Sequence, residues 1–157
     1  MLLNHHVYIL QAGANPNLRS STDNKILGTY PLSLAIQQGD VKMVHLLLKF
    51  EANPNIENDN FPFISAAVEK CYDKIAKLLI QYHAELNKLN YPPLIALLKS
   101  QNLECLKLLI MNGADSTQPF PFENKIITVQ DYYMKVKTPL LMQMIAFYPD
   151  ENFNSLF

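Results

Sequence analysis

The sequence predicts an all-α solenoid in which pairs of short helices stack along one axis. Two observations support this fold class. Apolar triplets that begin at Leu46, Leu78 and Leu108 recur at intervals of 32 and 30 residues, a period typical of solenoid repeats. Between them, apolar residues recur at i, i+3 and i+4, the spacing of one face of a helix. Because a single helix pair cannot bury both of its faces, we expect neighbouring pairs to stack.

Each repeat is expected to contain two helices. In the best-defined repeat, the first helix places Leu32, Ala35 and Ile36 on one face. Pro31 and Pro93 suit the first turn of such a helix, where the missing N–H would have no partner in any case. The second helix of the repeat shows the same apolar spacing at Val41, Val44, Leu47 and Leu48.

The repeated segments resemble the ankyrin repeat family. That family's pattern opens with T-P-L-H-x-A, continues into a second helix ending in L-L, and closes with G-A-D-x-N, at a period of about 33 residues. This chain has YPLSLA, PFISAA and PPLIAL at the opening positions, and GANPN, EANPN, HAELN and NGADS at the closing ones. The Thr and His of the family's opening are absent from all three repeats. The resemblance implies antiparallel helix pairs joined by hairpin loops.

The resemblance covers nearly the whole chain and implies a single ankyrin-repeat domain over residues 1–157. An enlarged first link and an aromatic-bearing insertion interrupt the regular period. The segment 125–137 within the insertion fits either a helix, with Ile126, Val129, Tyr133 and Val136 on one face, or an extended hairpin. We expect a half repeat at 1–17, repeats at 30–55, 62–87 and 92–116, the insertion at 118–137 and a terminal half repeat at 138–149.

The turns between helices are expected to need left-handed backbone angles. Asparagine is common, whereas there are only 4 glycines, and Asn adopts such angles more readily than most other residues. We therefore expect Asn to replace Gly in turns. His83 stands where the family has Gly, so it should be a strained turn residue, and Cys71 occupies the inter-helix Gly position. Cys105 falls at a core position of a second helix.

The overall composition narrows the classes of partner. The net charge is -1, with 13 basic and 14 acidic residues, which argues against nucleic acid because phosphate binding needs a basic surface. The apolar runs are far shorter than the ~20 residues that cross a bilayer, so we expect no membrane insertion. Two cysteines provide neither a disulfide framework nor a metal-ligand set, which suits a reducing compartment such as the cytoplasm.

No arrangement of residues suggests catalysis. His5 and His6 are adjacent, which is not the spacing of a zinc site. A Cys71–His83 nucleophile pair would lack a third group to orient it. Four glycines cannot build the usual phosphate-binding loop. The chain is therefore expected not to be an enzyme and to need no cofactor or metal.

The function expected from the resemblance is protein–protein interaction, through hairpin tips and a concave face built from the first helices. Phe61 and Tyr91 occupy equivalent positions, so their rings should lie side by side as the main anchors, with Thr29 continuing the row. The other expected contacts at the tips are Lys25, Ile26, Glu57, Asn58, Asp59, Lys88 and Leu89. Those at the first-helix ends are Gln37, Gln38, Glu69, Lys70, Lys99 and Ser100.

Two further interpretations stay open. One is a secreted pathogen effector that acts on a host protein in the host cytoplasm. The other is a structural or docking segment of a larger multidomain protein whose enzymatic activity lies elsewhere. The second is favoured by the ends of the chain, since residues 1–17 match only the second half of a repeat and TPLLMQMIAFYP supplies only a first helix.

Overall fold

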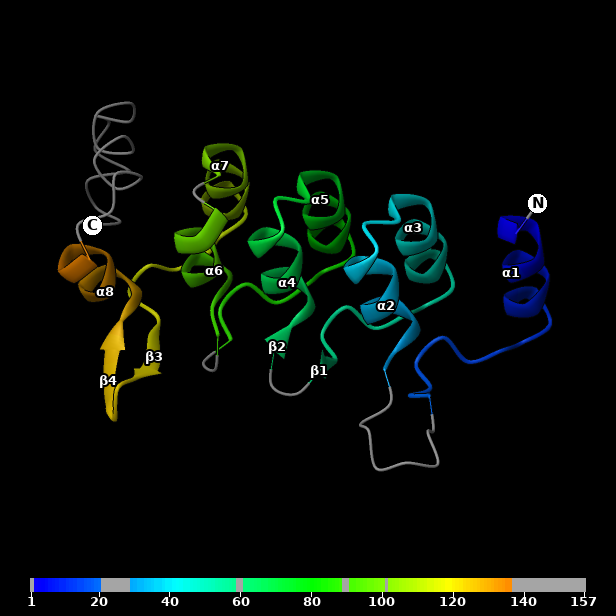
Figure 1. The fold of residues 1–157 in the computed structure, drawn as a ribbon, viewed down its shortest axis with the longest axis horizontal. Helices are drawn as coiled ribbons and strands as arrows, with labels where there is room; N and C mark the ends of the chain where they lie inside the picture. The colour runs from blue at the N-terminus through cyan, green and yellow to red at the C-terminus, as the bar shows by residue number, and fades with distance from the viewer. Residues whose placement is uncertain (1, 21–28, 59–60, 89–90, 101, 137–157) are drawn as a thin grey trace.

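The computed structural model describes residues 2–20, 29–58, 61–88, 91–100 and 102–136, and their helices stack side by side along one axis (Figure 1). The predicted all-α solenoid is confirmed. Three helix pairs form the centre of the stack, and a single helix stands at each end. The first helices of the pairs are α2 (Pro31–Gln37), α4 (Phe63–Glu69) and α6 (Pro93–Ser100). The second helices are α3 (Val41–Lys49), α5 (Asp73–Gln81) and α7 (Leu103–Met111), and the end helices are α1 (Leu2–Gln11) and α8 (Val129–Val136).

Two of the first helices, α2 and α6, begin at proline, as predicted. Pro31 and Pro93 are the first residues of α2 and α6, and Pro62 immediately precedes α4. Proline fits there because its fixed φ is already helical and its missing N–H has no helical partner to lose. A residue with positive φ follows two of these helices, Gly39 at 68° after α2 and Cys71 at 58° after α4. The chain thus reverses abruptly into the second helix.

Side-chain caps start two of the second helices. The carboxylate of Asp40 accepts a hydrogen bond from the Met43 backbone N–H at 3.0 Å. Asn102 accepts from the N–H groups of Glu104 and Cys105 at 3.0 and 3.2 Å. Such caps satisfy donors that the first turn of a helix leaves without partners.

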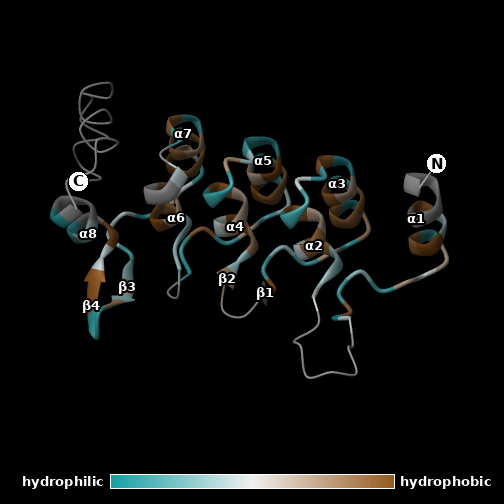
Figure 2. Cartoon of the chain, in the orientation of Figure 1, coloured by the Kyte–Doolittle hydropathy of each residue, from teal (hydrophilic) through white to brown (hydrophobic). Residues whose placement is uncertain are grey.

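One continuous core runs through the helix pairs. The first helices lie in one row and the second helices in another, and each packs on its counterpart in the neighbouring pair. Ala35, Ala67 and Ala96 are at most 2% exposed, and their small side chains let neighbouring first helices approach closely. Figure 2 shows hydrophobic residues on the helices of every pair and hydrophilic residues at the turns between them. The contact between α4 and α6 is the most extensive of those between helices. These helices belong to the two pairs that are joined by the link from α5 to α6.

Two antiparallel ribbons project from the same side of the stack (Figure 1). The shorter joins β1 (Glu57–Asn58) to β2 (Phe61–Pro62), with Asn58 opposite Phe61. The longer joins β3 (Pro119–Phe122) to β4 (Lys125–Thr128), with Phe120 opposite Ile127.

The insertion contains both a hairpin and a helix, so the two alternatives for 125–137 are each right for part of it. The predicted helical face is wrong at Ile126, which lies in β4 and is 79% exposed. The change from strand to helix falls at Thr128, whose hydroxyl donates to the Asp131 carboxylate at 2.7 Å and accepts from the Asp131 backbone N–H at 3.0 Å. This reciprocal cap starts α8 at Val129. The expected half repeat at 138–149 lies outside the described residues.

The lengths of the helices can be compared with the thickness of a membrane. Among the residues described, no helix is long and apolar enough to cross a bilayer.

Candidate interaction surface

The aromatic rings of Phe61 and Tyr91 lie against each other, as predicted. Their centroids are 4.7 Å apart and their planes are inclined by 39°. Phe61 opens β2 and Tyr91 stands just before α6, so the rings come from successive repeats. Both are half-buried. The Ser65 hydroxyl of α4 donates to the backbone carbonyl of Tyr91 at 2.8 Å and fixes the link that carries this ring.

A small hollow adjoins this aromatic pair. It measures about 90 Å³ and lies between α2 and α4, with Phe61 and Phe63 on one side and Ser33 and Gln37 on the other. Gln37 is exposed, and its amide donates to the Ser33 hydroxyl at 3.4 Å. The first-helix face therefore offers an aromatic wall beside polar groups, an arrangement that can receive an apolar side chain and orient it.

Thr29 is held in place by two hydrogen bonds of its backbone to Ser20. Its backbone carbonyl accepts from the Ser20 N–H at 3.0 Å, and its own N–H donates to the Ser20 hydroxyl at 2.9 Å. These bonds close the base of the enlarged first link. The ring next to it, Tyr30, packs edge-on against Phe63 at 6.3 Å and lies under the Arg19 guanidinium at 5.7 Å.

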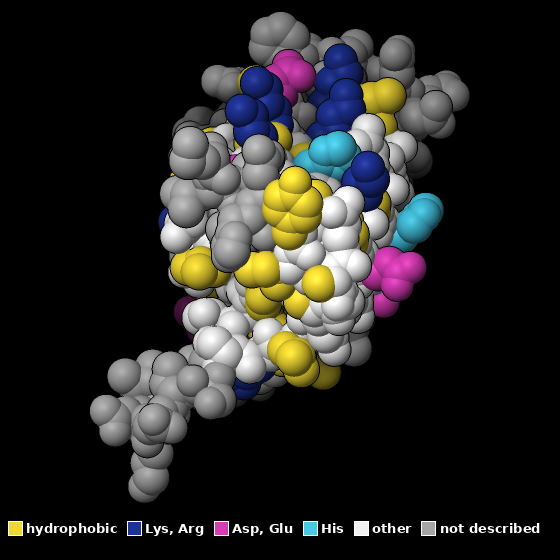
Figure 3. Space-filling view, turned by 90° about the vertical axis from the view of Figure 1, so that its right-hand side faces the viewer, with side chains coloured by type: hydrophobic (Ala, Val, Ile, Leu, Met, Phe, Trp, Pro, Cys, Tyr) yellow, Lys and Arg dark blue, Asp and Glu magenta, His cyan; other side chains and the backbone are white. Residues whose placement is uncertain are grey.

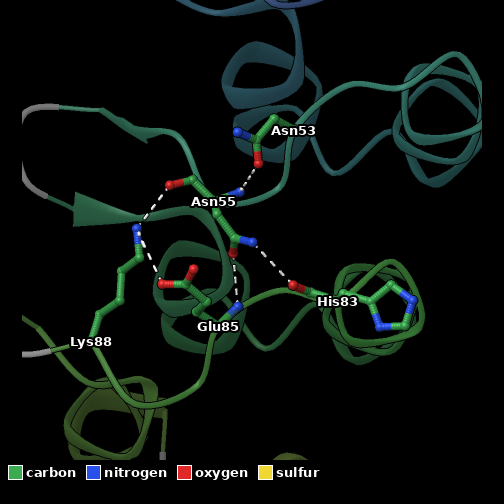
Figure 4. Close-up of polar contacts among 5 residues, drawn as sticks. All are labelled: Asn53, Asn55, His83, Glu85 and Lys88. Carbon is green, nitrogen blue, oxygen red and sulfur yellow. Dashed lines mark hydrogen bonds and ion pairs between the residues drawn. The ribbon is translucent and has the colours of Figure 1, made fainter.

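Lys88 is engaged within the fold rather than extended from a tip. Its Nζ donates to the Asn55 backbone carbonyl at 2.8 Å and lies 3.7 Å from the Glu85 carboxylate. Figure 4 shows the side chain reaching across to the neighbouring repeat. The contacts explain why Lys88 is half-buried although it belongs to a connecting loop.

The other expected contacts divide by position. Gln38 and Lys70 are exposed at the ends of α2 and α4, whereas Glu69 and Ser100 are half-buried. Glu57 and Asn58 lie in β1, and Lys99 lies in the last turn of α6. The remaining four, Lys25, Ile26, Asp59 and Leu89, lie outside the described residues.

Sequence reasoning missed a row of asparagines that ties the repeats together. The Asn55 carboxamide donates to the backbone carbonyl of His83 at 3.0 Å and accepts from the backbone N–H of Glu85 at 2.7 Å (Figure 4). Asn17 bonds in the same way to Glu51 and Asn53, and Asn87 to Gly113 and Asp115. The signal was available, since these are the last residues of GANPN, EANPN and HAELN.

The expectation that Asn replaces Gly at left-handed positions is wrong for the loops between repeats. The non-glycine residues with positive φ there are Glu51 at 66° and His83 at 63°. Asn124, at 63°, is the one asparagine with positive φ in the described part of the chain, and it turns the β3–β4 hairpin. The loop asparagines Asn17, Asn55 and Asn87 instead use their carboxamides for bonds to the next repeat.

The cysteines differ in environment. Cys71 is exposed, and Cys105 is buried in the core as predicted. The Cys105 thiol donates to the Asp73 carboxylate at 3.0 Å. Burial, reinforced by this bond and by the carboxylate's charge, raises the pKa of Cys105 far above its ordinary value. A thiol held neutral in this way is a poor nucleophile.

The described ranges hold no candidate metal site. There, no three or more His, Cys, Asp and Glu side chains gather where they could hold an ion.

Comparison with known proteins identifies the family. A family model described as ankyrin repeats (3 copies) matches residues 3–90 and again residues 32–120. The ankyrin repeat protein FPV222 of Fowlpox virus (strain NVSL) is 32% identical over 108 residues, which are 67% of this chain and 14% of that protein. The ankyrin repeat protein nuc-2 of Neurospora crassa is 32% identical over 112 residues, 68% of this chain and 10% of that protein. The chain thus spans a small part of the length of both relatives. It belongs to the ankyrin repeat family.

Proposed function

We propose that this chain is a protein–protein interaction module whose partner contacts the Phe61–Tyr91 pair and the adjoining first-helix face. Ankyrin repeats generally serve protein–protein interaction, and stacked repeats offer extended surfaces for it. The observation that carries the proposal is the pairing of two half-buried rings at 4.7 Å beside the hollow between α2 and α4. Aromatic side chains contribute a large share of the free energy at protein interfaces.

The polar surroundings of the rings add directional contacts. Gln37 and Gln38 are exposed at the end of α2, and Lys70 is exposed at the end of α4. A partner side chain placed in the hollow would lie beside Gln37, which lines it. The expected partner segment therefore carries one apolar anchor flanked by polar residues.

Site-specific photo-crosslinking tests the proposal. A benzophenone amino acid is placed at Phe61 in one variant and at Tyr8, which is 70% exposed on α1, in a matched control. Both are incubated with a lysate of the cells that express the protein. We expect a discrete adduct from position 61 that is absent from position 8, and unlabelled wild-type chain should compete it away. Equal adducts from both positions would contradict a partner site at the aromatic pair.

A second function is a docking segment within a larger protein. A hollow of about 540 Å³ lies between α1 and the α2–α3 pair, with Ile9, Leu34 and Met43 on its walls. Leu34 is 46% exposed, so this end of the stack can accept one more helix. The short share of each relative that the chain covers supports the same proposal. Fusing an amphipathic helix ahead of residue 1 should bury Leu34 and raise the melting temperature.

The effector role in a host cytoplasm is a narrower form of the first function. Similarity to an ankyrin repeat protein of Fowlpox virus supports it. Fractionation of host cells exposed to the source of this protein tests it directly, since an effector must appear in the host's soluble fraction.

A further inference from the structure

A basic groove lies between two second helices, apart from the aromatic pair. It has a volume of about 300 Å³, and the basic residues at its edges are Lys42 and His45 of α3 and Lys74 and Lys77 of α5. All four side chains are exposed. Val41 and Leu78, both half-buried, form an apolar part of the lining. We call this feature the outer-helix groove.

The basic residues of the outer-helix groove occupy equivalent positions in the two helices. Lys42 and Lys74 are the second residues of α3 and α5, and His45 and Lys77 are the fifth. Because α3 packs on α5, equivalent positions become neighbours. Figure 3 shows Lys, Arg and His side chains gathered in the upper part of the end view, where the second helices lie. The repeat therefore concentrates positive charge on a chain whose net charge is -1.

The carboxylates close to Lys42 and Lys74 in the sequence, Asp40 and Asp73, form hydrogen bonds to groups other than these lysines. Asp40 is used to cap α3 through the Met43 N–H. Asp73 accepts from the Asn102 carboxamide at 2.7 Å and from the Cys105 thiol, so it is directed toward α7. Lys42, Lys74 and Lys77 form no ion pair with any residue that the structure describes.

Two of the lysines also stand where the fold disfavours them. Lys42 and Lys74 are in the first turns of their helices, where the helix dipole favours negative charge and opposes positive charge. Neighbouring like charges add a repulsion. An anion bound in the groove would offset both the unfavourable helix-dipole interaction and the repulsion between the lysines. Anion binding therefore explains why lysines stand at these two positions, whereas the stability of the fold does not.

We propose that the outer-helix groove binds an acidic peptide segment of a partner protein. Carboxylates of the segment would lie against the lysines, and an apolar side chain between them would cover Val41 and Leu78. The half-buried apolar lining favours a peptide over nucleic acid, which needs a larger basic surface and commonly uses arginine. This surface is separate from the proposed aromatic site, so one chain could hold two partners or two parts of one partner.

Fluorescence anisotropy at low salt tests this inference with a defined probe. The probe is a fluorescein-labelled peptide of sequence EELEELEE, compared with QQLQQLQQ and with a thymidine octamer of similar charge. Wild-type chain should bind the acidic peptide in preference to both. Equal binding of the glutamine peptide, or tighter binding of the octamer, would overturn the proposal, as would failure to bind EELEELEE at all.

Charge-reversal variants locate the binding. Lys42→Glu/Lys74→Glu should weaken binding by at least about tenfold, because two attractions become repulsions. The control Lys49→Glu/Lys107→Glu makes the same change in net charge at two exposed lysines of α3 and α7 that do not line the groove, and it should cost less than about threefold. Equal losses in the two variants would show a net-charge effect and overturn the assignment.

Stability serves as an independent readout. Glutamate in the first turn is favoured by the helix dipole, so Lys42→Glu/Lys74→Glu should melt at a higher temperature than wild type. Lys42→Gln/Lys74→Gln removes charge without reversing it and should lose affinity to an intermediate extent. If the glutamine variant binds EELEELEE as tightly as wild type does, the lysines do not form the site.

Discussion

Asn55 holds the backbone of Glu85 in the next repeat, with its carboxamide oxygen 2.7 Å from the Glu85 nitrogen. Its amide nitrogen simultaneously donates to the His83 carbonyl at 3.0 Å. One side chain thus satisfies a donor and an acceptor of the following loop. Asparagine is suited to this because its short side chain carries both groups. Aspartate would lose the donor, and alanine would lose both.

Replacing Asn55 by Ala is expected to destabilise the stack by about 1–3 kcal/mol, because two backbone groups lose their partners and only partly regain them from water. The measurement is urea denaturation followed by circular dichroism. Asn112→Ala is the matched control, since among the residues described the Asn112 carboxamide bonds only within its own helix end, to Leu108 at 2.7 Å. Comparable losses for the two variants would show that the inter-repeat bonds of Asn55 have no special importance.

Glycine should stabilise the chain at the two strained loop positions. Glu51 and His83 have φ values of 66° and 63°, a region that costs an L-residue about 1 kcal/mol relative to glycine. Glu51→Gly and His83→Gly should therefore raise the melting temperature. The opposite sign is expected for His45→Gly, because His45 is exposed in the middle of α3, where glycine costs about 1 kcal/mol. A fall in melting temperature at Glu51 and His83 would mean that their side-chain contacts outweigh the backbone strain.

The two cysteines should differ in reactivity. Cys71 is exposed and Cys105 is buried with its thiol bonded to Asp73, so a maleimide should modify Cys71 quickly and Cys105 only after unfolding. Mass spectrometry of partly labelled protein distinguishes the sites, and Cys71→Ser should abolish the fast phase. Rapid labelling of Cys105 in folded protein would contradict the packing around α5 and α7.

Cys105 also predicts a pH dependence of stability. Burial raises its pKa in the folded state, so the unfolded chain releases this proton first as the pH rises. The contribution of Cys105 to the free energy of unfolding should be constant below the ordinary thiol pKa of about 8.5. Above that pH it should fall by at most about 1.4 kcal/mol per pH unit. Because Lys and Tyr titrate at still higher pH, the test is the difference between wild type and Cys105→Ala from pH 7 to 10. Parallel curves would contradict the prediction.

The helices were predictable because their signals are local. Leu32, Ala35 and Ile36 lie within five residues of each other, and all three are buried on one face of α2. The asparagine row was harder, because each Asn meets backbone groups 26 to 36 residues away. The high asparagine content alone suggested that these residues shape turns. Aligning the repeats would have shown that each of these asparagines faces the loop of the next repeat.

Two further features were visible in the sequence but needed a different reading. Thr128 and Asp131 have the spacing of a helix cap, which would have placed the start of the predicted helix after Ile126. Lys42 and Lys74 are one repeat length apart in the sequence, which places them side by side in the stack. The net charge of -1 gave no indication of this local cluster. Of the candidate contacts, the adjacency of Phe61 and Tyr91 followed from their equivalent positions, while the engagement of Lys88 depended on a carbonyl in the preceding loop.

The Phe61–Tyr91 pair should contribute both to the free energy of unfolding and to the free energy of partner binding, and the two contributions can be measured separately. Each ring is half-buried and contacts the other at 4.7 Å, so a double-mutant cycle to Ala should give a coupling of about 0.5–1.5 kcal/mol in unfolding. The fold should survive, because neither residue belongs to a helix and a domain of this kind is stable by about 5–15 kcal/mol.

Binding is the second readout for the same pair. If a partner identified by crosslinking at position 61 uses the rings as anchors, Phe61→Ala/Tyr91→Ala should weaken it by about 2–4 kcal/mol. Tyr8→Ala is the control, since that ring is 70% exposed on α1, and it should leave affinity unchanged. Unfolding of the double variant with unaltered affinity in the remaining folded fraction would make the rings structural. The partner site would then have to be sought on the exposed side of the β3–β4 hairpin, around Ile126.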